Sequence, residues 1–320
     1  MRGSVTDRNR RCPMNTQQSR TMAVVGAGVI GLSWARLAHR HGWRVTITDP
    51  RPDLGELIES EFGTDDRVSW TADLAEAVRD ADLVQENGPE RLPVKQQIFA
   101  EILRAAPADA VLATSSSSIT ASLIAADLDN AGRIVVGHPF NPPELMPLVE
   151  VLPGKKTDES TVTRAVALYT ELDRVPVVIR KELPGFVANR LQKVLSSEAT
   201  YLVQSGVVSV EDLDTILQNS IGLRWATIGL FEGNVLGGGP GGARHLFAGV
   251  GAEVGKIEAG KPSSEPEAMA ELIENIEATY GSGEQNYERL VAKRDRRTNA
   301  VLEALAKVDD RPAVYPSPSV

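Results

Sequence analysis

From Thr21 to about Ile179, short runs rich in β-branched residues alternate with stretches in which apolar residues recur every three or four positions. The short runs are typical of buried strands, and the periodic stretches are typical of amphipathic helices. A helix between two strands can return the chain for a parallel pairing, which a tight turn cannot do. The alternation therefore predicts a doubly wound α/β domain, in which helices cover a parallel sheet.

The elements of this domain can be placed from their apolar positions. The expected strands are Met22–Val25, Val45–Thr48, Val68–Trp70, Leu83–Glu86, Val111–Thr114, Ile134–Gly137, Leu148–Val151 and Val175–Ile179. The expected helices include Leu32–His41, Leu74–Arg79 and Gln96–Arg104.

After Pro184 the strand-like runs stop and helical periods dominate. The expected helices are Phe186–Val203, Val210–Gln218, Ala243–Ala259, Pro266–Tyr280 and Gln285–Ala306. We place the boundary near Leu183, because Pro184 and Gly185 end one pattern and open a long helix whose first turn contains Asn189. The glycine-rich segment 237–242 is expected to be a mobile loop within this helical domain.

The chain is thus predicted to contain a disordered leader (1–20), an α/β domain (21–183), an all-helical domain (184–309) and a disordered tail (310–320). The leader lacks the apolar core of a signal peptide, and no later window is long enough to span a membrane. Cys12 is the only cysteine, which excludes an internal disulfide and the usual thiolate zinc sites. We therefore expect a cytoplasmic protein without a metal centre.

A glycine motif follows the first strand and opens the first helix. Its sequence is Gly26-Ala27-Gly28-Val29-Ile30-Gly31. Gly26 permits a tight turn, Gly28 lets backbone N–H groups approach a pyrophosphate at the positive helix end, and Gly31 lets the helix pack closely on the strand. Because the motif lies between a strand and a helix, it predicts a dinucleotide site.

Asp49 ends the second expected strand, 18 residues beyond Gly31. A carboxylate at this position would accept hydrogen bonds from the ribose hydroxyls and repel a 2′-phosphate, which favours NAD over NADP. Arg51 lies two residues later and would be able to contact a 2′-phosphate. The class of cofactor is therefore better determined than the choice between the two dinucleotides.

His138 leaves the carboxyl end of an expected strand, where open α/β sheets bind their ligands. Glu150 lies inside an apolar strand and needs a partner if it is buried. A pair of these two side chains would fix the imidazole tautomer and stabilise the imidazolium, as a general base for alcohol oxidation requires. Capping or structural roles suit His39, His41 and His245 better.

Four segments together resemble the successive motifs of the L-3-hydroxyacyl-CoA dehydrogenase superfamily. They are Ser115-Ser116-Ser117-Ser118, His138-Pro139-Phe140-Asn141-Pro142, Leu148-Val149-Glu150 and Pro184-Gly185-Phe186-Val187-Ala188-Asn189-Arg190. The resemblance runs from about Thr21 to at least Phe231, in order and spacing. It implies an NAD-binding Rossmann domain followed by a helical domain that shapes the substrate pocket and pairs in a homodimer.

The resemblance also implies the catalytic residues. Ser117 matches the active-site serine of the family, His138 its general base, Glu150 the carboxylate that orients the base, and Asn189 the asparagine that holds substrate and transition state. Ser115 stands where relatives often have Asn, so Ser116 and Ser118 are alternatives to Ser117.

Three further residues match positions that contact the nicotinamide side of the cofactor in the family. They are Glu90, Lys95 and Asn141. Without the family, Glu90 and Lys95 would be interpreted as a surface ion pair and Asn141 as a turn residue.

The helical domain is similar to the branch of the superfamily that oxidises small free 3-hydroxy acids, the carnitine and gulonate dehydrogenases. The similarity lies in Gly222-Leu223-Arg224-Trp225-Ala226 and the following Gly229-Leu230-Phe231. Arg224 could bind a substrate carboxylate, and Trp225 and Phe231 could face a quaternary ammonium. The alternative is that Arg224 forms a structural ion pair and Trp225 packs in a helical core.

We therefore expect an NAD-dependent enzyme that oxidises the 3-hydroxyl of a small L-3-hydroxy acid. The alternative substrate is a 3-hydroxyacyl thioester of CoA or of a carrier protein, and the alternative of another class is a non-catalytic NAD-binding structural protein. A formal net charge of −9 argues against nucleic acid as a partner. The expected partners are the small-molecule substrate and a second copy of the chain.

Overall fold

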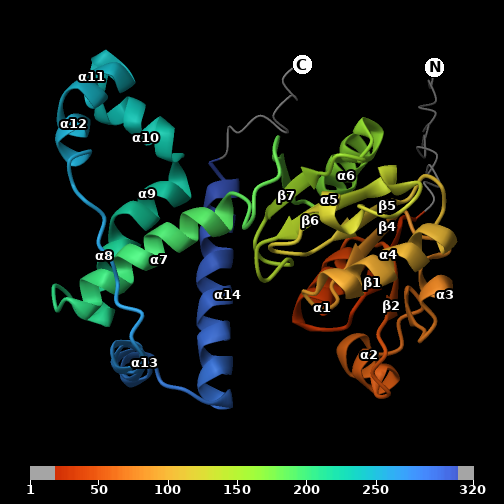
Figure 1. Cartoon of the computed structure of the whole chain (residues 1–320). Coiled ribbons are helices and arrows are strands. Elements are labelled where there is room, and N and C mark those ends of the chain that lie inside the picture. The colour runs from red at the N-terminus through yellow and green to blue at the C-terminus, as the bar shows by residue number, and fades with distance from the viewer. Residues whose placement is uncertain (1–18, 309–320) are drawn as a thin grey trace, which may run out of the picture. The chain divides into compact units, whose positions relative to one another are not determined.

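The computed structural model describes residues 19–308, which form two compact units divided between Pro184 and Gly185 (Figure 1). The predicted leader, apart from its last two residues, and the whole of the predicted tail lie outside the described residues, and so does Cys12. The first unit is an α/β sandwich and the second is helical, which confirms the fold class expected from the sequence.

The first unit is built on an eight-stranded sheet with the order β3-β2-β1-β4-β5-β6-β7-β8. The strands are β1 (Thr21–Val25), β2 (Arg44–Thr48), β3 (Val68–Trp70), β4 (Leu83–Glu86), β5 (Val111–Thr114), β6 (Ile134–Pro139), β7 (Leu148–Pro153) and β8 (Val175–Val178). The chain order reverses between β1 and β4, and a crevice at such a point is where ligands bind in open α/β sheets.

One pairing departs from the predicted parallel sheet. Strands β1 to β6 are parallel, whereas β7 pairs antiparallel with β6, and β8 then runs parallel to β7. The connection from β6 to β7 contains only residues 140–147. A parallel pairing needs a crossover of about a dozen residues or more, so this short connection dictates an antiparallel neighbour.

Helices cover both faces of the sheet. They are α1 (Val29–Arg40), α2 (Leu54–Phe62), α3 (Leu74–Val78), α4 (Leu92–Ala105), α5 (Ala121–Ile124) and α6 (Glu159–Glu171), of which α2, α5 and α6 were not predicted. The main apolar core joins α1, α2 and α6 to one face and contains Leu83 of β4. Because successive strand residues face opposite sides, Gln85 shares the face of Leu83, and Glu86 faces α4.

The second unit contains eight α-helices within residues 185–308. They are α7 (Ala188–Gln204), α8 (Val210–Asn219), α9 (Ile221–Thr227), α10 (Leu230–Gly237), α11 (Gly242–Ala248), α12 (Val250–Val254), α13 (Pro266–Tyr280) and α14 (Glu284–Ala306). The helix predicted at Ala243–Ala259 is wrong as a single element, because the chain breaks at Gly249 between α11 and α12. Gly249, Gly251 and Gly255 lower the helix propensity of this stretch.

The segment 237–242, expected to be a loop, is mostly helical. It contains the last residue of α10, a short 3-10 helix (Gly239–Gly241) and the first residue of α11. Gly239 and Gly242 have φ values of +56° and +59°, which side-chain-bearing residues rarely adopt. The glycines therefore form a compact connection between two helices.

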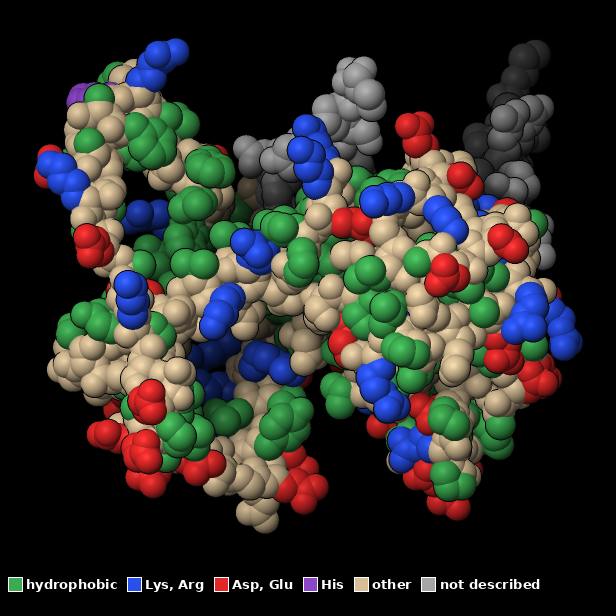
Figure 2. Space-filling model, viewed as in Figure 1, with side chains coloured by type: hydrophobic (Ala, Val, Ile, Leu, Met, Phe, Trp, Pro, Cys, Tyr) green, Lys and Arg blue, Asp and Glu red, His purple; other side chains and the backbone are tan. Residues whose placement is uncertain are grey.

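Few side chains of the second unit are buried. Among residues 185–308, only Phe186, Gly238 and Leu272 are buried, whereas Phe231 is 75% exposed and Val250 is 70% exposed. Figure 2 shows hydrophobic side chains on the surface formed by α10 and α11. None of the helices within residues 19–308 is long and apolar enough to cross a membrane.

Candidate functional site

The glycine turn at the end of β1 has the geometry of a dinucleotide-binding loop. Gly26 has φ +100°, and a Cβ there would lie 3.0 Å from the backbone carbonyl group of Asn87. A Cβ on Gly31 would overlap the Gly26 carbonyl oxygen, so the first turn of α1 packs directly on the strand end. Gly28 caps α1, and the space beside its Cα is open. A pyrophosphate can therefore approach the positive end of this helix.

Asp49 lies beside this turn. Its Oδ2 accepts a hydrogen bond from the Ala27 N–H at 2.8 Å, and its Oδ1 accepts one from the Arg51 N–H at 3.0 Å. The carboxylate thus holds the glycine turn and the end of β2 together. Arg51 itself donates from Nε and Nη2 to both carboxylate oxygens of Asp53, each at 2.7 Å. This ion pair keeps the guanidinium engaged with Asp53.

We expect Asp53→Asn to raise the ratio of kcat/KM with NADP to kcat/KM with NAD. Removing the carboxylate charge releases Arg51, which would be able to meet a 2′-phosphate, while Asp49 still favours a free ribose. An exposed ion pair is a weak interaction, so the expected rise is small, about two- to fivefold. Steady-state kinetics with both dinucleotides measure it, with Asp66→Asn as the control. An unchanged ratio would show that Arg51 has no influence on this choice.

The carboxyl edge of the sheet also carries a buried His–Glu pair. His138 Nδ1 lies 2.9 Å from Glu150 Oε2, and the two side chains are 5% and 2% exposed. The pair follows from the sheet, because His138 and Glu150 are directly opposite each other on the antiparallel strands β6 and β7. A carboxylate at Nδ1 assigns the proton to that nitrogen, so Nε2 carries the lone pair that a general base needs.

The serine run follows β5, and its four hydroxyl groups have different environments. Ser116 Oγ and Ser118 Oγ donate to Glu90 Oε1 at 2.6 and 2.8 Å, and the Ser118 N–H donates to the same atom at 3.0 Å. Ser115 Oγ bonds to Asn87 on the neighbouring loop. Ser117 is exposed between these anchored neighbours. Ser118 is exposed as well, but its hydrogen bonds to Glu90 anchor it, so Ser117 is the exposed serine of the run that Glu90 does not hold.

Lys95 and Glu86 form a second buried pair. Lys95 Nζ lies 2.8 and 3.0 Å from the two carboxylate oxygens of Glu86, which also accept from Thr114 Oγ1 at 2.6 Å and the Gly88 N–H at 2.7 Å. The side chains of Lys95 and Glu86 are 1% and 0% exposed. Glu90 Oε2 is 3.6 Å from Lys95 Nζ. The ammonium thus joins the end of β4 to the loop that carries Glu90.

The pKa of Glu90 is lowered from its ordinary value of 4.5. Burial acts in the opposite direction, but the hydrogen bonds from Ser116 and Ser118 and the charge of Lys95 outweigh it. A carboxyl group whose pKa is lower in the folded state stabilises the fold above its unfolded pKa, and the stabilisation disappears as the pH falls through the folded pKa.

We therefore expect the stability difference between the natural protein and Glu90→Gln to be largest above pH 4.5 and to shrink on acidification. Melting temperatures recorded from neutral to acid pH measure it, with the exposed Glu101→Gln as the control. A difference that persists unchanged through the acid range would contradict this role of the Glu90 carboxylate.

The remaining predicted residues lie at three places. Asn141 is exposed, two residues beyond β6. Asn189 is half-buried in the first turn of α7, as predicted, and Arg224 and Trp225 are exposed on α9, with Trp225 43% exposed. These last three residues belong to the second unit. Within this unit, Trp225 is therefore not packed in a helical core.

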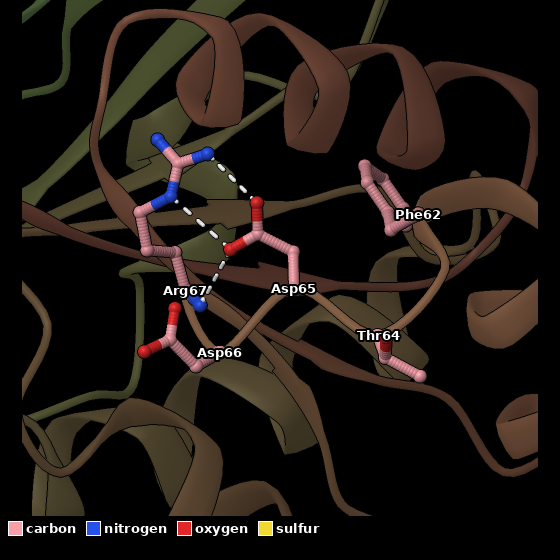
Figure 3. A pocket seen from close by; sticks show the side chains of 5 residues that line it. All are labelled: Phe62, Thr64, Asp65, Asp66 and Arg67. Carbon is pink, nitrogen blue, oxygen red and sulfur yellow. Dashed lines mark hydrogen bonds and ion pairs between the residues drawn. The ribbon is translucent and has the colours of Figure 1, made fainter.

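A hollow lined by Phe62, Thr64, Asp65, Asp66 and Arg67 lies elsewhere (Figure 3). It precedes β3 and is therefore at the amino edge of the sheet, away from the glycine turn and His138. Asp65 and Arg67 point toward each other, and hydrogen bonds from Arg67 and His39 hold the pKa of Asp65 well below its usual range. These contacts fix the loop before β3 and place His39 in a structural role.

Two buried polar residues at the end of β4 belong to the candidate site but were not predicted from the sequence. Gln85 and Glu86 are both 0% exposed and bond to partners on opposite faces of the sheet. The sequence does contain a signal for them. A parallel strand that is buried on both faces is expected to be apolar throughout, and Gln85 and Glu86 depart from that pattern. Two polar residues that end such a strand need buried partners, and these partners define the floor of the site.

Comparison with known proteins places these features in a family context. Residues 59–183 match the model described as "3-hydroxyacyl-CoA dehydrogenase, NAD binding domain", and residues 185–289 match "3-hydroxyacyl-CoA dehydrogenase, C-terminal domain". Residues 14–85, which contain the glycine turn, also match "Alanine dehydrogenase/PNT, C-terminal domain".

Curated relatives are similar over most of the chain. L-carnitine dehydrogenase of Pseudomonas putida is 35% identical over 89% of this chain and 94% of its own length. The enzyme of the same name from Nocardiopsis dassonvillei is 37% identical over 91% and 93%. A 3-hydroxyacyl-CoA dehydrogenase of Gibberella moniliformis is 40% identical over 71% and 75%.

Among solved structures, FHMPC 5-dehydrogenase, described as an NAD+ dependent dismutase, is 28% identical with a TM-score of 0.74. The match covers 90% of this chain and 99% of that one. Similarity over nearly the full length of both chains extends across the two units.

Proposed function

Because the chain belongs to the 3-hydroxyacyl-CoA dehydrogenase family, we propose that it oxidises the 3-hydroxyl group of a small, free L-3-hydroxy acid to a ketone with NAD. The observation that carries the proposal is the buried His138–Glu150 pair, which lies at the same sheet edge as the glycine turn. An oxidation of this kind needs a base beside the dinucleotide, and this edge offers both.

The chemistry divides between the cofactor and the chain. Bound NAD supplies the acceptor for the hydride that leaves the alcohol carbon. His138 Nε2 accepts the hydroxyl proton, and Glu150 holds the proton on Nδ1 and stabilises the imidazolium that results. In the reverse direction the imidazolium returns the proton to the ketone oxygen.

Ser117 and Asn189 complete the proposed catalytic set. A hydroxyl and an amide donor can hold the reacting oxygen and stabilise negative charge that develops on it. The anchoring of Ser115, Ser116 and Ser118 supports Ser117 as the member of the run that meets the substrate.

On the nicotinamide side we retain Glu90, Lys95 and Asn141. Lys95 donates to Glu86 and to the Gly88 carbonyl oxygen at 3.3 Å, so its contribution to cofactor binding is to hold the loop that carries Glu90. Asn141 is exposed beyond β6 and is available as a donor.

For the substrate, we propose a small carboxylic acid of the carnitine or gulonate type. The full-length similarity to L-carnitine dehydrogenases supports it. In this proposal Arg224 binds the substrate carboxylate and Trp225 faces the remainder of the molecule. A second candidate is a 3-hydroxyacyl-CoA thioester, supported by the relative from Gibberella moniliformis, whose similarity covers less of both chains.

Purified protein should be assayed with L-carnitine, L-gulonate and (S)-3-hydroxybutyryl-CoA in parallel, following the absorbance of reduced nicotinamide with NAD and with NADP. We expect saturation with a free acid and with NAD. A preference for the thioester would favour the second candidate. Binding of NADH without turnover of any of the three would contradict the proposed activity and favour a non-catalytic NAD-binding protein.

We also propose that the first unit binds NAD and that the helical unit shapes the substrate pocket and forms a homodimer. The 23-residue helix α14 buries no residue, and Leu191, Val194, Phe231 and Val250 are each more than 60% exposed. Apolar side chains in this number are typical of a covered surface. Light scattering after size-exclusion chromatography tests the dimer, and a monomer at micromolar concentration would contradict it. The single cysteine and the use of NAD support a cytoplasmic location.

A further inference from the structure

A buried polar network lies behind the strand that carries His138. Gln85, on β4, is 0% exposed, and Tyr169, on α6, is also fully buried. Tyr169 Oη donates to Gln85 Oε1 at 2.7 Å. Gln85 Nε2 donates to Ser115 Oγ at 2.7 Å and to the Gly137 carbonyl oxygen at 3.1 Å. One side-chain amide thus connects α6 with the ends of β5 and β6.

The network continues to the loop beside the glycine turn. Ser115 Oγ donates to Asn87 Oδ1 at 2.7 Å and accepts from Trp34 Nε1 at 3.2 Å. Asn87 Nδ2 donates to the Gln85 carbonyl oxygen at 2.7 Å. The backbone carbonyl group of Asn87 is the one against which Gly26 packs. These contacts link the floor of the sheet to the proposed pyrophosphate site.

Two members of the network fix the direction of every hydrogen bond. The Gly137 carbonyl oxygen can only accept, so the amide nitrogen of Gln85 must face it, and Tyr169 must donate to the amide oxygen. The Trp34 N–H can only donate, so Ser115 accepts from it and from Gln85, and gives its own proton to Asn87. Burial raises the pKa of the Tyr169 phenol, which keeps that donor protonated.

Gly137 explains why Tyr169 can reach this place. A Cβ at residue 137 would overlap the Tyr169 hydroxyl group, so a side chain there would displace the tyrosine. Successive strand residues face opposite sides of the sheet. Tyr169 packs against β6 at Gly137, and His138, the next residue, faces the opposite side. The tyrosine ring is further held by Trp34, with ring centroids 5.6 Å apart.

We propose that Tyr169, acting through Gln85, is a positioning residue that aligns the His138 strand with the bound dinucleotide. The network holds Gly137 on one side and, through Ser115 and Asn87, the loop at the glycine turn on the other. Hydride transfer depends steeply on the distance and angle between donor and acceptor, and small displacements are costly. This inference rests on the proposed dehydrogenase function.

The test compares Tyr169→Phe with Thr161→Val. Thr161 is a buried residue of the same helix whose Oγ1 donates to the Gly132 carbonyl oxygen at 2.9 Å, at the amino edge of the sheet. Both variants lose one buried hydroxyl donor and keep nearly the same volume. Gln85→Met removes the central amide, and the double variant Tyr169→Phe/Gln85→Met tests whether the two residues act as one unit.

Two measurements are made on each folded variant. NADH fluorescence titration needs no substrate, and we expect Tyr169→Phe to weaken binding about three- to tenfold, as for one lost net hydrogen bond. With the 3-hydroxy acid that the natural protein oxidises, we expect kcat to fall about 10- to 100-fold. The kinetic isotope effect of substrate deuterated at the alcohol carbon should rise. The double variant should resemble Gln85→Met alone.

The outcomes separate this inference from the proposed function. If Tyr169→Phe binds NADH and turns over like Thr161→Val, with only a lower melting temperature, the network is structural and the inference fails. If the natural protein oxidises none of the three substrates, the proposed function fails, and the NADH titrations alone decide whether the network positions the cofactor loop. Additive losses in the double variant would also overturn the proposed relay.

Discussion

The variant His138→Gln is expected to lose turnover while it still binds NAD. The glutamine keeps a polar side chain of similar size opposite Glu150, but its amide cannot accept the alcohol proton. Removal of a general base costs about 10²- to 10⁴-fold in rate. The measurement is kcat with the preferred 3-hydroxy acid, together with the NADH dissociation constant from fluorescence titration.

His245→Gln is the matched control, because it removes an exposed histidine of α11 and leaves the buried pair intact. We expect it to retain full activity. If His138→Gln lost NADH affinity and turnover in equal measure, the imidazole would be a cofactor or folding residue, and its role as a base would be excluded.

Lys95→Met should give the largest loss of stability among these variants. The substitution leaves the Glu86 carboxylate fully buried with hydrogen bonds but without its countercharge. Removing one partner of a buried ion pair destabilises a protein by about 3–5 kcal/mol, since the remaining charge has lost both water and its partner. The free energy of unfolding in urea, followed by a probe of the α/β unit, measures the effect.

The double variant Glu86→Gln/Lys95→Met removes both charges and should recover much of this loss. It also keeps the prediction testable if the single variant does not fold. Lys156→Met is the control, because Lys156 is exposed and donates to the backbone carbonyl oxygens of Ala126 and Leu128 rather than to a carboxylate. A loss below about 1 kcal/mol in Lys95→Met, the value of an exposed pair, would show that water reaches the buried ion pair.

Much of the α/β unit could be predicted because its signals are local. The apolar runs at β3, β4 and β5 coincide with the strands of the structure, and the glycine motif lies where a strand meets a helix. The antiparallel strand β7 could not be predicted from its own residues, because its direction depends on the length of the connection from β6. In the helical unit, α9 and α10 were not predicted, and the glycine-rich connection was assigned the wrong conformation.

In the candidate site, too, contacts between neighbouring elements could be predicted and contacts between distant ones could not. His138 and Glu150 could be paired from the sequence because both lie in strands that are near each other in the chain. Gln85 and Tyr169 are separated by 84 residues, and no local pattern relates them. Their contact depends on the packing of α6 against the sheet, which pattern analysis does not give. Ser115 stands where relatives often have Asn, and its hydrogen bonds to Trp34, Gln85 and Asn87 become visible only in the folded network.

The cross-strand pairing of His138 with Glu150 also determines which changes of length the chain can accept during evolution. Deleting one residue within β6 or β7 would turn one of the two side chains to the opposite face, while every residue type stayed in the sequence. The connection of residues 140–147 carries no such parity requirement. Small changes of length should therefore be tolerated there beyond Asn141, which is proposed to contact the cofactor, and should be lethal to activity in the flanking strands.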